Sequence, residues 1–97
     1  MLKAAENLIL REIAGESVLV PVGEAALRLQ GVISLSESGT LLWKRLSQEC
    51  TREELIDMIL EEYDIDILTA ERDVDAFVSQ MRQLGILEEN ISAENRK

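Results

Sequence analysis

The order of apolar and polar positions divides the chain into a strand-rich first half and a helical second half. Apolar and β-branched residues cluster or alternate in three ranges that we predict to be strands, namely 8–13, 17–22 and 32–35. Gly15 supplies the turn between the first two. Pro21 has no N–H to donate, so the second strand lies at an edge or ends near it. Residues 1–7 are expected to be a short lead, that is, a segment that precedes the first strand without regular structure. Residues 23–30 are expected to form either a loop or a single helical turn.

Helix signals with recognisable caps begin at Ser36, whose hydroxyl can accept a free backbone N–H of a first helix, with Ser38 as the alternative cap. This helix is predicted to run to about Gln48, with three apolar side chains facing inward: Leu42, Trp43 and Leu46. Thr51 and Glu54 form a capping box for a second helix. Its apolar stripe consists of Leu55, Ile56, Ile59, Leu60 and Tyr63.

The clearest amphipathic pattern belongs to a third helix, which we predict to be capped by Thr69 and stopped by Gly85. Its apolar positions are Ala70, Val74, Phe77, Val78, Met81 and Leu84. The pair Ile86–Leu87 is expected to fold back on the core. The predicted fold class is α+β, a winged-helix-like three-stranded antiparallel sheet followed by three helices. One domain would span 1–88, with a polar tail over 89–97.

Charge and composition narrow the functions open to the chain. The 97 residues carry a net charge of −9, and within 51–66 seven carboxylates face a single Arg. The negative electrostatic potential of such a chain repels nucleic acid and anionic membrane surfaces. The sequence lacks histidine, has one cysteine, and has no apolar run long enough to span a bilayer. We therefore expect no metal, no cofactor, no nucleic acid, no membrane, and a cytoplasmic location.

No catalytic group emerges from the pattern of reactive residues. The serines lack a histidine or lysine base, the glycines form no phosphate loop, and Cys50 is expected to be a loop cysteine. The protein is therefore expected not to be an enzyme. A winged-helix regulator acting on DNA or a protein partner is one alternative. The other is a peptide-binding domain that accepts a partner strand beside the third strand and against the last helix.

Several segments, taken in order, resemble the PqqD family, the small recognition elements of ribosomally synthesised and modified peptides (RiPPs). They are Val32–Gly39, Leu42–Trp43, Thr51–Leu55, Glu62–Asp64, Asp73–Val78, Met81 and Leu84–Leu87. The resemblance runs from about Gly31 to Leu87. Ser36 departs from the family, which usually has Asn at this position, but Ser can cap the helix equally well.

The resemblance implies a non-catalytic peptide chaperone. Such a protein would bind the leader of a precursor peptide as an added strand and present it to a maturase, often a radical S-adenosylmethionine enzyme, in PQQ or other RiPP biosynthesis. The implied ladder residues are Val32, Ile33, Ser34 and Leu35. The implied helix residues are Asp73, Ala76, Phe77, Gln80, Met81 and Leu84. A monomer and a homodimer both stay open.

Overall fold

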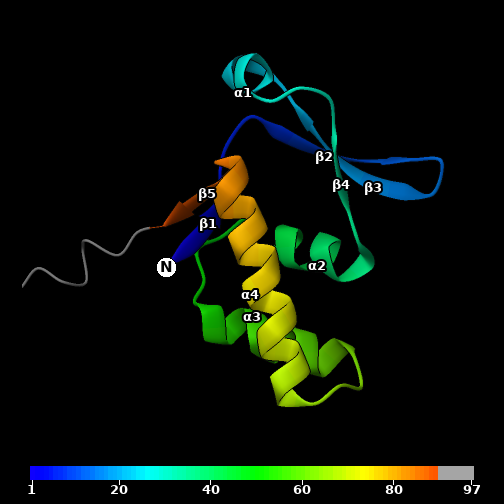
Figure 1. Ribbon diagram of the computed structural model, residues 1–97, viewed down its shortest axis with the longest axis vertical. Helices are drawn as coiled ribbons and strands as arrows, with labels where there is room; N and C mark the ends of the chain where they lie inside the picture. The colour runs from blue at the N-terminus through cyan, green and yellow to red at the C-terminus, as the bar shows by residue number, and fades with distance from the viewer. Residues whose placement is uncertain (90–97) are drawn as a thin grey trace, which may run out of the picture.

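The computed structural model describes residues 1–89 and shows a mixed α+β fold of the winged-helix-like kind (Figure 1). The elements, in order, are β1 (Leu2–Ala4), β2 (Leu8–Ile13), β3 (Glu16–Pro21), α1 (Gly23–Arg28), β4 (Ile33–Leu35), α2 (Glu37–Arg45), α3 (Arg52–Glu62), α4 (Ile67–Leu84) and β5 (Leu87–Glu89). The predicted fold class is confirmed, and β1, α1 and β5 are added to it.

Strands β2, β3 and β4 form an antiparallel sheet in that order. Ala14 and Gly15 make the two-residue turn between β2 and β3, with φ of +54° and +83°. Two successive positive φ values suit a tight hairpin, because they match the right-handed twist of the strands. Pro21 is the last residue of β3, so its missing N–H costs the sheet little. Val32 lies outside β4, which is one residue shorter than predicted.

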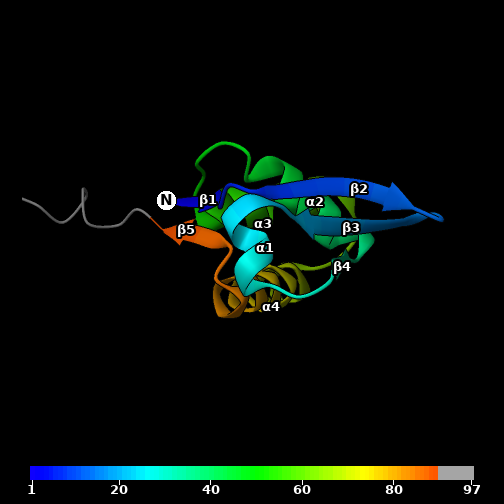
Figure 2. The ribbon, with the colours of Figure 1, turned by 90° about the horizontal axis from the view of Figure 1, so that it is seen from above.

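The stretch left open between β3 and β4 contains the short helix α1, which lies against β3 (Figure 2). Ala25 is its buried residue, whereas Leu27 is 87% exposed.

Both predicted caps of the first two long helices are confirmed. The Ser36 hydroxyl accepts the Gly39 N–H at 3.0 Å, and Thr51 and Glu54 each accept the other's backbone N–H. Helix α2 ends at Arg45, three residues before the predicted end, and Leu46 is fully buried beyond it.

Helix α4 starts earlier than predicted, and Thr69 is not its cap. The Asp66 carboxylate accepts the Thr69 N–H at 2.8 Å, so the helix begins at Ile67. A carboxylate at the positive end of the helix is stabilised by the macrodipole as well as by the hydrogen bond, which favours Asp66 over the hydroxyl three residues later. Gly85 ends the helix with φ of +74°, as predicted.

The two ends of the described chain meet in a small sheet that was not predicted. β1 pairs with β5, and Leu2 also bridges to Cys50. The Ala4 N–H donates to the Leu46 carbonyl at 2.9 Å, and the Ala5 N–H to the Ile86 carbonyl at 2.9 Å. Residues 1–7 are therefore more than a lead. Glu89, assigned to the tail, belongs to β5, and the rest of the predicted tail, 90–97, lies outside the described residues.

A core shared by the sheet and the helices holds these elements together. Trp43 is 7% exposed and packs in this core, as expected for the residue that ties the sheet to the helices. The other buried members are Leu19, Leu42, Leu46, Cys50, Leu55, Ile56, Ile59, Ala70, Val74, Phe77, Val78, Met81 and Ile86. Seen from above, α4 lies on the β4 side of the sheet (Figure 2).

Candidate functional site

Strand β4 is an edge strand. β3 pairs with one of its sides, with Leu19 opposite Ile33 and Ser17 opposite Leu35, and among residues 1–89 no strand pairs with the other side. Ile33 and Leu35 are half-buried against the core, whereas Ser34 is exposed. An unpaired strand edge presents a row of backbone donors and acceptors that can form a ladder with another chain.

A hollow of about 260 Å³ lies between the start of α2 and the face of α4. Its lining residues are Ser36, Ser38, Gly39 and Leu42 from α2 and its cap, and Asp73, Ala76, Phe77 and Gln80 from α4. A Cβ added at Gly39 would lie 3.7 Å from the Phe77 ring and 3.1 Å from the Ser36 hydroxyl. The missing side chain at Gly39 therefore keeps the floor of the hollow open beside Phe77.

Four of the six helix residues implied by the family resemblance line this hollow: Asp73, Ala76, Phe77 and Gln80. Leu84 lies one turn beyond Gln80 on the same helix face and is half-buried. Met81 is fully buried in the core. A side chain without exposed surface offers nothing to a docked peptide, so the structure assigns Met81 to packing.

The strand residues divide in a similar way. Val32 is 51% exposed and directly precedes β4, so it lies in the loop before the strand and not in the strand itself. Ser34 and Leu35 line a second, larger hollow on the other side of Ser36. Sequence reasoning used Ser36 and Ser38 only as caps and passed over Gly39. Their place at the start of α2, directly after an edge strand, was the signal that could have added them to the site.

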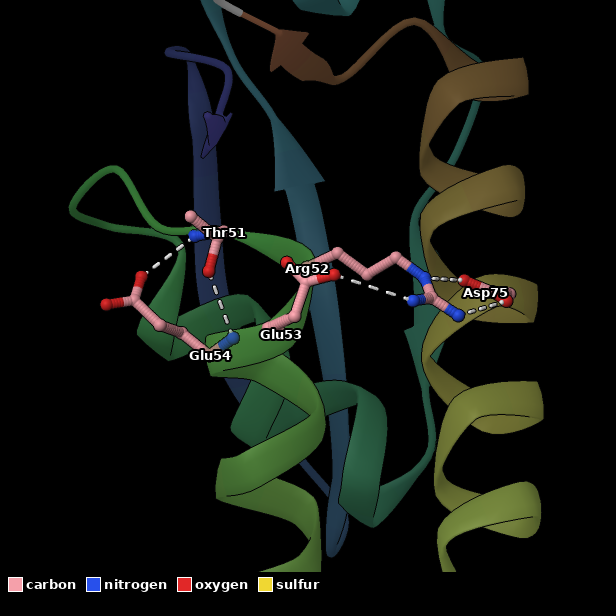
Figure 3. Close-up of polar contacts among 5 residues, drawn as sticks. All are labelled: Thr51, Arg52, Glu53, Glu54 and Asp75. Atoms are coloured by element: carbon pink, nitrogen blue, oxygen red, sulfur yellow. Dashed lines mark hydrogen bonds and ion pairs between the residues drawn. The ribbon is translucent and has the colours of Figure 1, made fainter.

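One exposed ion pair joins α3 to α4. The Arg52 guanidinium donates two hydrogen bonds to the Asp75 carboxylate, at 2.7 and 2.9 Å, and lies 3.8 Å from Glu53 (Figure 3). The hydrogen bonds from Arg52 hold the pKa of Asp75 below its usual range. Asp75 is the neighbour of Ala76, so this fork fixes the helix next to the hollow, while the capping box orients the first turn of α3 (Figure 3).

The described residues offer little for covalent or metal chemistry. Cys50 is fully buried, and desolvation raises the pKa of its thiol. Residues 1–89 contain no group of three or more carboxylate or cysteine side chains placed to hold a metal ion. No helix in this range is long and apolar enough to cross a bilayer.

The family model described as "Coenzyme PQQ synthesis protein D (PqqD)" matches residues 9–87. The chain belongs to the PqqD family. The match begins in β2 and ends at the first residue of β5, so it includes β4, the start of α2 and all of α4. None of the curated proteins matches the sequence.

Two solved structures share the fold of this PqqD-family chain. One is described as "TbiB1 in Complex with the TbiA(beta) Leader Peptide", with 27% sequence identity, a TM-score of 0.72 and coverage of 91% of this chain and 96% of that chain. The other is described as "Lasso peptide synthetase B1 complexed with the leader peptide", with 18% identity, a TM-score of 0.70 and coverage of 91% and 98%.

Proposed function

We propose that this protein binds the leader segment of a ribosomally made precursor peptide along the free side of β4. The observation that carries the proposal is the edge of β4 next to the hollow between α2 and α4. The PqqD family match and the two similar proteins, each in complex with a leader peptide, support it. Backbone hydrogen bonds to alternate residues of β4 would supply affinity that is independent of the peptide sequence.

Selectivity would come from the hollow. Phe77 is 8% exposed at its floor, and Ala76 is small and exposed, so an apolar side chain of the peptide can enter without displacing α4. Asp73 and Gln80 place polar groups at the two ends of this patch, one turn away on either side. Such a site takes an extended peptide with one apolar side chain directed at Phe77 and polar groups beside it.

The role is presentation of the peptide to a maturation enzyme in the cytoplasm, without catalysis by this chain. The missing histidine and the buried Cys50 support this part of the proposal. Family membership points to a maturase of the radical S-adenosylmethionine kind. A regulator acting on DNA is less well supported, because Arg52 and Arg82 are engaged by Asp75 and Glu89 in a chain of net charge −9.

The test starts from a displayed library of random peptides selected on the immobilised protein. The best peptide is titrated into ¹⁵N-labelled protein, and its affinity is measured by calorimetry. We expect amide shifts at Ile33–Leu35 and around Ala76 and Gln80. Ala76→Asp places an uncompensated charge against an apolar side chain and should weaken binding on the order of tenfold or more.

Ser79→Asp is the matched control. Ser79 is exposed on α4 but is not among the residues that line the hollow, and the charge added is the same. Circular dichroism confirms that both variants fold. Failure to enrich any peptide, or shifts confined to α1 and β2, would contradict the proposed function.

A further inference from the structure

A second, wide hollow lies under the β2–β3 hairpin, on the other side of Ser36 from the site described above. Its volume is about 860 Å³, and it is bounded by the hairpin turn at Gly15, by α2, and by the end of α3 at Tyr63. Figure 1 shows the hairpin projecting past α2. Most residues that line this hollow lie outside the proposed leader site; only Ser36 lines both hollows.

The rim of this hollow carries more negative than positive side chains. Glu12, Glu16, Glu37 and Glu62 line it, together with one cation, Lys44. None of these four carboxylates has an ion-pair or hydrogen-bond partner within residues 1–89. The charged groups that line another hollow, at the start of α3, behave differently, since Arg52 is paired with Asp75 and Arg82 with Glu89.

The floor is apolar. Leu35, Leu41 and Tyr63 are half-buried and contribute to the lining. Burial raises the pKa of the Tyr63 hydroxyl, and the charges of Glu37 and Glu62 raise it further, so these carboxylates and the ring share one space. An apolar floor below an acidic rim matches a side chain with an aliphatic stem and a cationic head, which is the build of lysine and arginine. An aromatic ring beside the head adds a cation–π attraction.

The hollow is also continuous with the proposed leader site. Ser36 lines both spaces, and Ser34 and Leu35 belong both to β4 and to the wall of the larger hollow. The sheet is antiparallel throughout. A strand that extends this pattern beside β4 would run from the Leu35 end to the Ile33 end. The residues that precede its paired segment would therefore extend past Leu35, on the side of β4 away from β3, toward Ser36 and Glu37, which line the hollow.

From these observations we propose that the acidic hollow under the hairpin selects leader peptides with a lysine or arginine just before the segment that pairs with β4. The inference rests on the proposed function. The stem of the cationic side chain packs on Leu41 and Tyr63, and its head lies near the carboxylates of Glu37 and Glu62, while Glu12 and Glu16 add negative charge on the hairpin side. The rim would then favour basic leaders and repel acidic ones before any ladder forms.

The test uses the displayed library of random peptides described above, selected in parallel on the wild type and on Glu12→Gln/Glu62→Gln. Both substitutions remove charge without removing volume, and neither residue lies at a helix start. Peptides enriched on the wild type should carry Lys or Arg at a fixed spacing before their apolar segment. That preference should be lost on the double variant.

The best wild-type peptide should bind the double variant about three- to thirtyfold more weakly, because exposed ion pairs each contribute modestly. Added salt should weaken wild-type binding and should have less effect on the variant. Glu6→Gln/Glu88→Gln is the matched control, since it removes the same charge at two exposed positions outside the helices and away from the hollow. It should bind like the wild type.

Two different failures can be told apart. Enriched peptides that shift the amides of Ile33–Leu35 but show no preference for Lys or Arg before the apolar segment would overturn this inference and leave the proposed function standing. Equal loss of affinity in the hollow variant and its control would overturn it as well. Peptides that leave β4 and α4 unperturbed would overturn the proposed function and this inference together.

Discussion

Single side chains at helix ends decide where the helices of this protein begin. Ser36, Thr51 and Asp66 each accept a backbone N–H three residues ahead, at 3.0, 3.1 and 2.8 Å. Two of these caps had a competitor close by in sequence, because Ser38 could have capped α2 and Thr69 is also a good cap residue. The hydrogen bonds with Thr69 chiefly lower the pKa of Asp66, because they favour the charged form of its carboxylate.

Replacement of Asp66 tests this assignment. Asp66→Ala should lower the urea midpoint of unfolding, because the Thr69 N–H loses its partner at the start of α4. Asp66→Asn should retain most of the stability, since an amide oxygen caps nearly as well. Asp64→Ala is the control at an exposed position just outside the helix. Equal midpoints for Asp66→Ala and Asp64→Ala would mean that another residue caps α4.

At the scale of the element, α4 has one face buried in the core and a neighbouring face that lines the hollow, and Phe77 belongs to both. One face, with Val74, Val78 and Met81, is buried in the core. The neighbouring face, with Asp73, Ala76 and Gln80, lines the hollow beside α2. A single amphipathic stripe in the sequence therefore serves both the stability of the domain and the proposed binding of a peptide.

The two faces should separate by mutation. Met81→Ala should cost about 2–5 kcal/mol of unfolding free energy, because it leaves a cavity at a fully buried site. Gln80→Ala should change stability little and should reduce affinity for the selected peptide. Chemical denaturation and calorimetry on the folded variants measure the two effects. A Met81→Ala protein with wild-type stability and lost binding would place Met81 in the site after all.

Across the whole molecule, exposed ion pairs join one secondary-structure element to another. Arg52 and Asp75 connect α3 to α4, and Arg82 and Glu89 connect α4 to β5. The hydrogen bonds from Arg82 lower the pKa of Glu89, as those from Arg52 lower the pKa of Asp75. Together with Asp66, these carboxylates are more acidic in the folded chain than in the unfolded one.

Stability should therefore depend on pH in the acid range. A carboxylate with a lowered pKa stabilises the folded state above its unfolded pKa of about 4, and this contribution is lost as the pH falls through its folded pKa. The wild type should lose urea resistance below about pH 4 more steeply than Asp66→Asn/Asp75→Asn/Glu89→Gln. The comparison with this variant removes the opposing effect of the net charge of −9, which weakens as other carboxylates are protonated. Parallel curves for the two proteins would contradict the assignment.

Local signals in the sequence determined most of the elements. The hairpin at Gly15, the caps Ser36 and Thr51, the stop at Gly85 and the apolar stripe of α4 each depend on residues a few positions apart, whose geometry is set by the backbone itself. The composition and the family resemblance together indicated a peptide-binding domain. Four of the helix residues named from that resemblance do line the hollow.

Only the tertiary structure decided the pairings and exposures that depend on distant segments. The pairing of β1 with β5 joins residues more than 80 positions apart, and three-residue strands carry too little pattern to be recognised alone. The division between Met81 in the core and Gln80 at the hollow depends on where α2 and α3 pack against α4, which the helical period by itself does not contain. The acidic hollow likewise arises because the hairpin, α2 and the end of α3 bring together four glutamates that are scattered between positions 12 and 62.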